Sequence, residues 1–289
     1  MNISQSKMSN IGVDVSFSFM PWRCSSSSFC CGRSACYVHN SILYSVSTRF
    51  RCNLCKIWEK MLHKNHHPVH HGRGMRLLVV DLLAEREGFG KAGVREIVHH
   101  FSPKEVFLWS PHTKERLDYG HGTVVNRPVE ADAVVITGSR RNVTMWESWM
   151  DEVVELIHTV KVPLYGICFG HQIIAHAFGG RIVRASEDSH FVAEVHGKDG
   201  TTVFASFAHQ EHVVDAGDLD VVASAAHCEI AACRHPSKPI FTVQYHPETV
   251  SEVLDVAFSC GEMNAQERSA YIDDLLTTNV AVAFGLEPR

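Results

Sequence analysis

The sequence predicts an α/β protein with a mainly parallel sheet, helices on both faces and a small, partly antiparallel sheet. Three observations lead to this fold class. Nearly all-apolar strand segments alternate with helical segments, as in parallel sheets that are buried on both faces. One strand passes through a glycine-flanked turn into a helix, at Pro163–Gly180. Residues able to do chemistry directly follow predicted strands, where open α/β sheets place their sites.

The first half of the predicted domain alternates strands and helices. A loop is expected at Gly88–Gly93 and a polar, turn-rich stretch at 111–130. Apolar residues at helical spacing predict helices over Val94–Phe101 and Val143–Val160. The strands are expected at 75–81 (MRLLVVD), 105–109 (EVFLW), 131–137 (ADAVVIT) and 160–166.

After Gly180 the pattern changes to short strands with alternating polarity, which indicates a partly antiparallel region. Two helices are expected to follow, over Glu248–Phe258 and Ala265–Phe284, with Gly285 ending the second. The short strands are expected at 181–184, 191–195, 203–207, 221–225, 229–234 and 240–244.

Cys168 lies in the turn between Gly166 and Gly170, followed by an amphipathic helix that ends at Gly179 and Gly180. This spacing is that of a nucleophile elbow with cysteine as the nucleophile. Small residues on both sides let the strand and helix pass closely, and the helix amides favour a thiolate. On its own the motif is equally compatible with a buried structural cysteine.

A second stretch supplies what a thiol nucleophile needs. The apolar strand Ile240–Gln244 runs into His246, Pro247 and Glu248. A nucleophilic thiol requires a base, and the base requires a group that orients it. His246 and Glu248 are two residues apart at a strand end, so both can point the same way.

GICFGHQ followed by QYHPE resembles the class I (triad-type) glutamine amidotransferases, whose glutaminase domain uses a Cys-His-Glu triad. The resemblance implies the flavodoxin-like glutaminase fold over residues 75–289. It assigns the catalytic triad to Cys168, His246 and Glu248, and it implies no metal or cofactor. It covers none of residues 1–74.

The resemblance also extends to the oxyanion and substrate sites. One oxyanion donor is expected to be the amide of Phe169, directly after the nucleophile. The stretch ITGSRRNV resembles the glycine-rich oxyanion loop of the family, which usually has Gly-Gly-Pro where this chain has Gly138, Ser139 and Arg140. The amide of Ser139 can still donate, but the loop conformation is put in question.

For the substrate, the resemblance implies contacts from Gln172. The stretch SFAHQEHV resembles the His-containing substrate loop of the family, with His209 at the position of its histidine. The other histidines of the domain, His212 among them, are interpreted as exposed or as hydrogen-bonded within the fold. Cys228 and Cys233 are interpreted as core residues.

Charge separates the chain into two parts. Residues 1–74 carry nine basic and two acidic residues, whereas residues 75–289 carry 18 basic and 30 acidic residues, a formal charge of −12. An acidic catalytic part argues against nucleic acid as a partner. No apolar run approaches the roughly 18 residues of a membrane span.

Residues 1–74 are expected to be an unstructured extension or a targeting segment, being serine-rich, basic and poor in acidic residues. Met75 then becomes a candidate start. A third interpretation is a small metal site, because Cys52 and Cys55 precede a run of histidines. The location is expected to be the cytoplasm, or an organelle if this segment is a targeting signal.

The size of the domain bears on function. Residues 75–289 suffice for one glutaminase domain, and the sequence has no phosphate-binding GxxxxGK[ST] loop. The favoured hypothesis is a glutaminase that hydrolyses L-glutamine and releases ammonia for an acceptor on a separate synthase subunit. One alternative is a γ-glutamyl peptidase-like cysteine hydrolase that acts on other γ-glutamyl compounds. Another is a non-catalytic regulatory or binding module.

Overall fold

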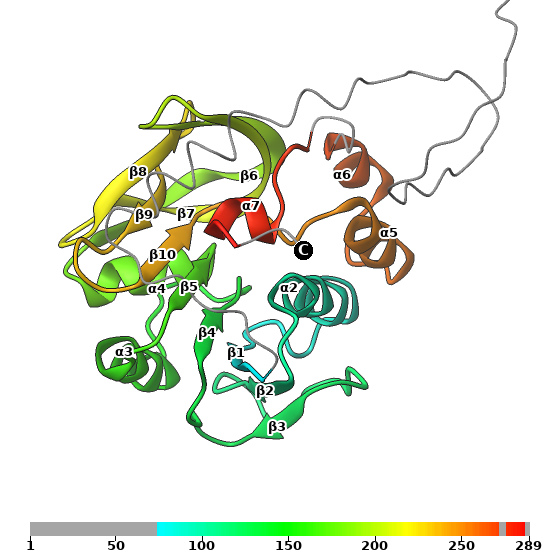
Figure 1. Ribbon diagram of the computed structural model, residues 1–289. Coiled ribbons are helices and arrows are strands. Elements are labelled where there is room, and N and C mark those ends of the chain that lie inside the picture. Colours follow the sequence, from blue (N-terminus) through cyan, green and yellow to red (C-terminus); the bar gives the residue numbers. More distant parts are fainter. Residues whose placement is uncertain (1–73, 272–275, 287–289) are drawn as a thin grey trace, which may run out of the picture. The chain divides into compact units, whose positions relative to one another are not determined.

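The structure, a computed structural model, describes residues 74–271 and 276–286. The predictions for the N-terminal segment, its proposed metal site included, lie outside the described residues. Ten strands form one sheet in the order β3-β2-β1-β4-β5-β10-β9-β8-β6-β7 (Figure 1). From β3 to β10 all neighbours are parallel, and from β10 to β7 all are antiparallel.

The predicted fold class is confirmed, with the antiparallel strands continuing the main sheet. The strands are β1 (Arg76–Val80), β2 (Glu105–Trp109), β3 (Thr123–Val125), β4 (Ala133–Ile136), β5 (Leu164–Ile167), β6 (Arg181–Gly197), β7 (Thr202–Asp215), β8 (Asp220–Ala225), β9 (Cys228–Arg234) and β10 (Ile240–Val243). The helices are η1 (Glu87–Ala92), α2 (Gly93–Phe101), α3 (Trp149–Thr159), α4 (Phe169–Ala177), α5 (Ser251–Ser259), α6 (Ala265–Ala270) and α7 (Val280–Phe284).

Two apolar cores cover the two faces of the parallel strands. Alternate residues of β1 point to opposite faces, so Leu77 packs with α2 and α7 whereas Leu78 packs with α3 and α4. Figure 1 shows α3 on one side of the parallel strands and α2 on the other. This double covering explains why β1 and β4 are almost wholly apolar.

Three predictions in the first half of the domain were wrong. The loop expected at Gly88–Gly93 is largely η1, a π-helical turn, and the amides of Gly88 and Phe89 donate to the carboxylate of Glu262, both at 3.0 Å. The polar stretch 111–130 contains the short strand β3. Helix α3 begins at Trp149 rather than at residue 143, because the preceding loop is held by a buried carboxylate described below.

Two further predictions failed in the second half. Strands β6 and β7 are long and continuous where shorter strands were expected, because this end of the sheet tolerates polar residues on its exposed positions. The single helix expected over Ala265–Phe284 is instead α6 and α7. Between them Thr277 is hydrogen-bonded to Phe204 of β7: its amide donates to the Phe204 carbonyl (3.1 Å) and its hydroxyl accepts from the Phe204 amide (2.8 Å). Gly285 ends α7 at a φ of 61°, as predicted.

Candidate active site

Three neighbouring parallel strands bring the predicted catalytic segments together. β4, β5 and β10 are adjacent in the sheet, and Gly138, Cys168 and His246 follow their carboxyl ends. A Cβ atom at Gly138 would lie 2.8 Å from Cε1 of His246 and 3.6 Å from Cβ of Cys168. The three segments therefore meet at one point of the sheet edge, although Cys168 and His246 are 78 residues apart in sequence.

Cys168 has the strained backbone of a nucleophile elbow. Its φ of 51° and ψ of −100° are unusual for a residue with a side chain. A Cβ atom at Gly166 would lie 2.7 Å from the carbonyl of Gly170, and one at Gly170 would lie 2.3 Å from the carbonyl oxygen of Ile136. The predicted reason for the two flanking glycines, close passage of strand and helix, is confirmed.

His246 and Glu248 form a buried pair. Nδ1 of His246 lies 2.8 Å from Oε1 of Glu248, and the residues are 9% and 3% exposed. Burial alone would lower the pKa of His246, but the neighbouring Glu248 and Cys168 outweigh it and hold this pKa well above its usual value. The imidazole is therefore held as an imidazolium beside the thiol.

The two predicted oxyanion donors lie on segments that flank Cys168. Phe169 is the first residue of α4, so its amide has no acceptor within the helix. Ser139 follows Gly138 in the loop after β4, and its hydroxyl accepts from the amide of Arg141 (3.0 Å). Among the described residues, no acceptor is recorded for the amide of Ser139. Oxyanion binding by these amides stays a prediction.

A buried carboxylate that the sequence analysis missed anchors the far end of this loop. Glu211 on β7 is 2% exposed. It accepts from the amide of Val143 (2.7 Å), the amide of Thr144 (3.2 Å) and the Thr144 hydroxyl. These bonds replace helical ones, which is why α3 starts late. The sequence gives no signal for this role, because the partners lie 67 and 68 residues apart.

Two glutamine side chains lie in line behind the nucleophile. Nε2 of Gln172 donates to the carbonyl of Glu211 (2.8 Å) and to Oε1 of Gln244 (3.3 Å), and Nε2 of Gln244 contacts Sγ of Cys168 at 3.6 Å. Both N–H donors of Gln172 are thus used inside the protein, and its contact with substrate stays a prediction. The sequence analysis missed Gln244, although it precedes His246 by two residues and is polar within an apolar strand.

The segment SFAHQEHV is strand rather than loop, since all of Ser206–Val213 lies within β7. Its middle passes the nucleophile, because Sγ of Cys168 contacts the carbonyl of Ala208 at 3.7 Å. His209 is 6% exposed, and burial together with the neighbouring His212 lowers its pKa to about 3. His209 is therefore neutral, and its predicted role in binding substrate stays a prediction.

The predicted core cysteines are buried as expected. Cys228 and Cys233 are 2% and 1% exposed, and burial raises the pKa of each to about 12. All four cysteines in the described part of the chain are free thiols. These two thiols are therefore protonated at neutral pH.

Comparison with known families agrees with the fold. The sequence model of the family described as "Glutamine amidotransferase class-I" matches residues 94–259, more than half of the chain. This chain therefore belongs to the class I glutamine amidotransferase family. The match includes Cys168, His246 and Glu248.

Individual relatives are similar over shorter stretches. The chain is 35% identical over 104 residues to a subunit of the glutamine-hydrolyzing GMP synthase of Methanothermobacter thermautotrophicus, which is 33% of this chain and 56% of the relative. It is 32% identical over 136 residues to the corresponding GMP synthase subunit of Saccharolobus solfataricus, 43% of this chain and 72% of the relative. Several of these matches span only about half the length of the relative.

A solved structure is similar over more of the chain. A glutamine amidotransferase from Thermotoga maritima superposes with a TM-score of 0.54 at 14% identity, covering 74% of this chain and 90% of the other. At this identity the similarity concerns the fold.

Proposed function

We propose that this protein is a glutaminase of the amidotransferase type, which hydrolyses the side-chain amide of L-glutamine through Cys168, His246 and Glu248. The observation that carries the proposal is the cysteine on a strained elbow beside a buried imidazolium–carboxylate pair. A thiolate needs a nearby cation and an orienting carboxylate, and this arrangement supplies both.

The proposed reaction has two steps. The Cys168 thiolate attacks the carboxamide carbon of glutamine, the C–N bond breaks, and the leaving nitrogen takes the proton of His246 to depart as ammonia. The resulting γ-glutamyl thioester is attacked by water, whose proton goes to His246, and the C–S bond breaks to give glutamate. Glu248 keeps the imidazole oriented throughout, and the amides of Phe169 and Ser139 hold the oxyanion in each step.

The proposal includes a separate acceptor for the ammonia. The archaeal relatives are named as one subunit of a glutamine-hydrolyzing synthase, which supports a partner synthase subunit for this chain. In the described part of the chain, no helix has the length and apolar character to cross a bilayer. Free thiols and a thiolate nucleophile suit a reducing compartment, so we propose a cytoplasmic location.

The test is release of glutamate and ammonia by the full chain from L-glutamine. Cys168→Ala is expected to lose at least about 10³-fold in kcat/KM, because the nucleophile is removed, and to stay folded, because only one side-chain atom is lost. Cys260→Ala, which changes an exposed free thiol, is the matched control and is expected to keep full activity.

A γ-glutamyl peptide is assayed in parallel. Cleavage of the peptide with glutamine left intact would replace the proposal with the γ-glutamyl hydrolase alternative. Activity toward neither compound, together with a Cys168 that resists alkylation, would favour the non-catalytic module.

A further inference from the structure

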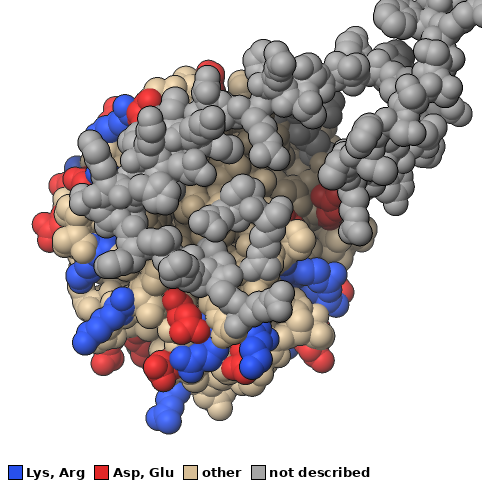
Figure 2. All heavy atoms as spheres, in the orientation of Figure 1, with Lys and Arg blue, Asp and Glu red and all other residues tan. Residues whose placement is uncertain are grey.

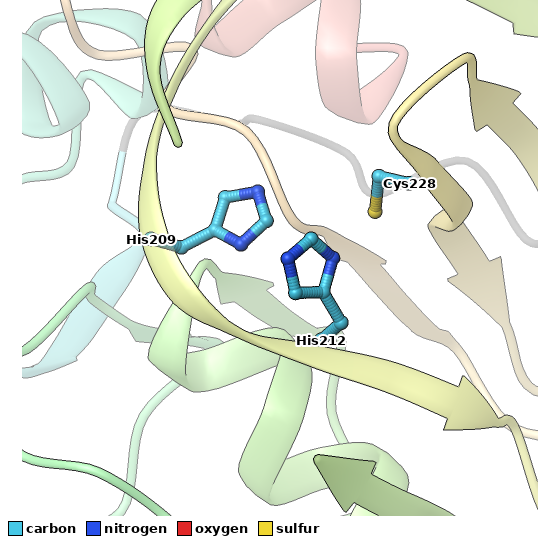
Figure 3. A group of neighbouring side chains, drawn as sticks. All are labelled: His209, His212 and Cys228. Carbon is cyan, nitrogen blue, oxygen red and sulfur yellow. The ribbon is translucent and has the colours of Figure 1, made fainter. Parts of the chain in front are cut away.

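Three side chains that can bind a metal meet beside the candidate active site. His209 and His212 lie on β7, and Cys228 begins β9. One ligand atom from each lies within 4.8 Å of the other two (Figure 3). In Figure 3 the two imidazole rings lie side by side, with the Cys228 sulfur beyond the His212 ring, and the ring planes meet at 68° in an edge-to-face contact. The described residues contain no other group of three with this spacing.

The group forms opposite an irregularity in the sheet. The register between β6 and β7 shifts between Arg184 and Ser189, and Ser189 pairs with His209. The extra residues lie on β6, because Arg184 and Ser189 are five residues apart whereas their partners Glu211 and His209 are two apart. On β7 the rings of His209 and His212 are in contact, with centroids 4.5 Å apart. The sequence analysis missed this group because it treated each histidine and Cys228 separately.

His209 is already oriented as a metal-binding histidine. Its Nδ1–H donates to the carbonyl of Glu211 at 3.0 Å, which leaves the lone pair on Nε2. Metal-bound histidines usually fix their second nitrogen in this way. Nε2 is buried and has no hydrogen-bond partner among the described residues. A buried nitrogen without a partner destabilises the fold, and a metal bond would offset that cost.

We propose that His209, His212 and Cys228 bind a transition metal ion of borderline softness, represented by Zn²⁺, with a fourth position open to water. Imidazole and thiolate are the ligands that Zn²⁺ prefers. Tetrahedral bonds of about 2.1–2.3 Å place ligand atoms roughly 3.5 Å apart, so the widest separation must close by about 1 Å. On binding, the Cys228 thiol gives its proton to solvent as the metal–sulfur bond forms.

The metal-site proposal does not depend on the glutaminase proposal. It is incompatible with the predicted role of His209 in binding substrate. If Nε2 of His209 binds a metal, that atom is not available to a substrate. The ion would also reach the nucleophile indirectly, because Cys168 contacts the carbonyl of Ala208, the residue before His209. Metal occupancy is therefore expected to change the reactivity of Cys168.

The binding test uses the full chain and four variants, Cys228→Ser, Cys233→Ser, Cys168→Ala and His212→Gln. Cys233 is the matched control, because it is equally buried and lies on the same strand but outside the group. Residues 1–73 contain six cysteines, so the readout is the difference between variants rather than the total metal load. Zn²⁺ is measured by equilibrium titration, and Co²⁺ is used to detect thiolate-to-metal charge-transfer absorption.

Cys228→Ser is expected to lose one equivalent of Zn²⁺, or to bind it at least about tenfold more weakly, and to lose charge-transfer intensity. Cys233→Ser and Cys168→Ala are expected to keep both. His212→Gln is expected to lose the equivalent as well. Equal binding by Cys228→Ser and Cys233→Ser overturns the proposal, and so does loss of the equivalent in Cys168→Ala alone, which would assign the ion to the catalytic thiol.

Alkylation of Cys168, followed by mass spectrometry of its peptide, tests the link to the nucleophile without an activity assay. Zn²⁺ is expected to slow this alkylation in Cys233→Ser and to leave it unchanged in Cys228→Ser. Equal slowing in both variants would mean that the metal acts directly on Cys168 and would refute the link.

Discussion

At the scale of single residues, the proton on His246 determines how the candidate site works. The pKa of His246 is raised in the folded protein, so the histidine stabilises the fold fully below about pH 6.5, its ordinary pKa. That contribution to stability is lost as the pH rises through the raised pKa that His246 has in the folded protein. Loss of this proton also removes the acid that the proposed mechanism needs for the departing ammonia.

Replacing Glu248 with glutamine is expected to move the alkaline limb of the kcat/KM profile to lower pH by about 1–3 units. The reason is that the neutral amide no longer stabilises the imidazolium. The measurement is glutamate release between pH 6 and pH 10, at constant ionic strength, with exposed Glu130→Gln as control. An alkaline limb that stays in place would show that Glu248 does not set this pKa.

Adding a methyl group at Gly138 is expected to displace the base. In Gly138→Ala the new Cβ would lie 2.8 Å from Cε1 of His246, closer than van der Waals contact, so the imidazole must shift. A shift of about 1 Å can cost about 10²-fold in kcat.

Gly120→Ala is the control for this variant, because Gly120 has open space around it although its φ is 70°. That variant is expected to lose about 1–2 kcal/mol of unfolding free energy and to keep its kcat. Unchanged kcat in Gly138→Ala would contradict the proposed location of the reaction.

The site residues predicted correctly from the sequence belong to short motifs, in which the spacing of neighbouring residues indicates their role. The glycines around Cys168 and the two-residue step from His246 to Glu248 are of this kind. Glu211 and the metal-binding group depend on contacts between β7 and distant segments, and Gln244 depends on its contacts with Gln172 and Cys168. The residues that make these contacts are far apart in the sequence, so their roles were found only in the folded structure.

At the scale of elements, β7 contacts two parts of the candidate active site. Its carboxylate at Glu211 holds the loop that begins at Gly138, and its carbonyl at Ala208 contacts the Cys168 thiol. The apolar strands β1, β2 and β4 were predicted closely, because burial on both faces leaves an unmistakable apolar run. The lengths of β6 and β7 were not predicted, because these strands contain polar segments that resemble turns in the sequence.

Glu211→Gln is expected to lower the free energy of unfolding by about 1.5–3 kcal/mol, since it weakens hydrogen bonds to a buried charged group. It is also expected to lower kcat, because the loop carrying Ser139 loses its anchor. Chemical denaturation and glutamate release measure the two effects. Thr144→Ser keeps the hydroxyl that Glu211 accepts from and is expected to stay within about 0.5 kcal/mol of the wild type. Equal stability of Glu211→Gln would show that the anchor is dispensable.

At the scale of the whole molecule, charge and sheet order define what surrounds the site. On the face shown in Figure 2, the Lys and Arg side chains of the described residues are interspersed with Asp and Glu. That nucleic acid is not a partner stays a prediction from the acidic charge of residues 75–289. The nucleophile and the base come from β5 and β10, which are neighbours in space with four strands between them in sequence.

That order has a consequence for how the enzyme is made. Pairing β10 with β5 joins residues 76 apart in sequence, such as Leu164 and Ile240, and closing this loop costs about 4 kcal/mol of entropy before the contacts between the strands form. The thiol of Cys168 should therefore exist for a time during folding without its imidazolium. Pulse alkylation during refolding is expected to find a slow, ordinary thiol at early times and a fast one only once β10 has docked. In a newly synthesised chain, the Cys168 thiol would then stay unreactive until β10 has paired with β5.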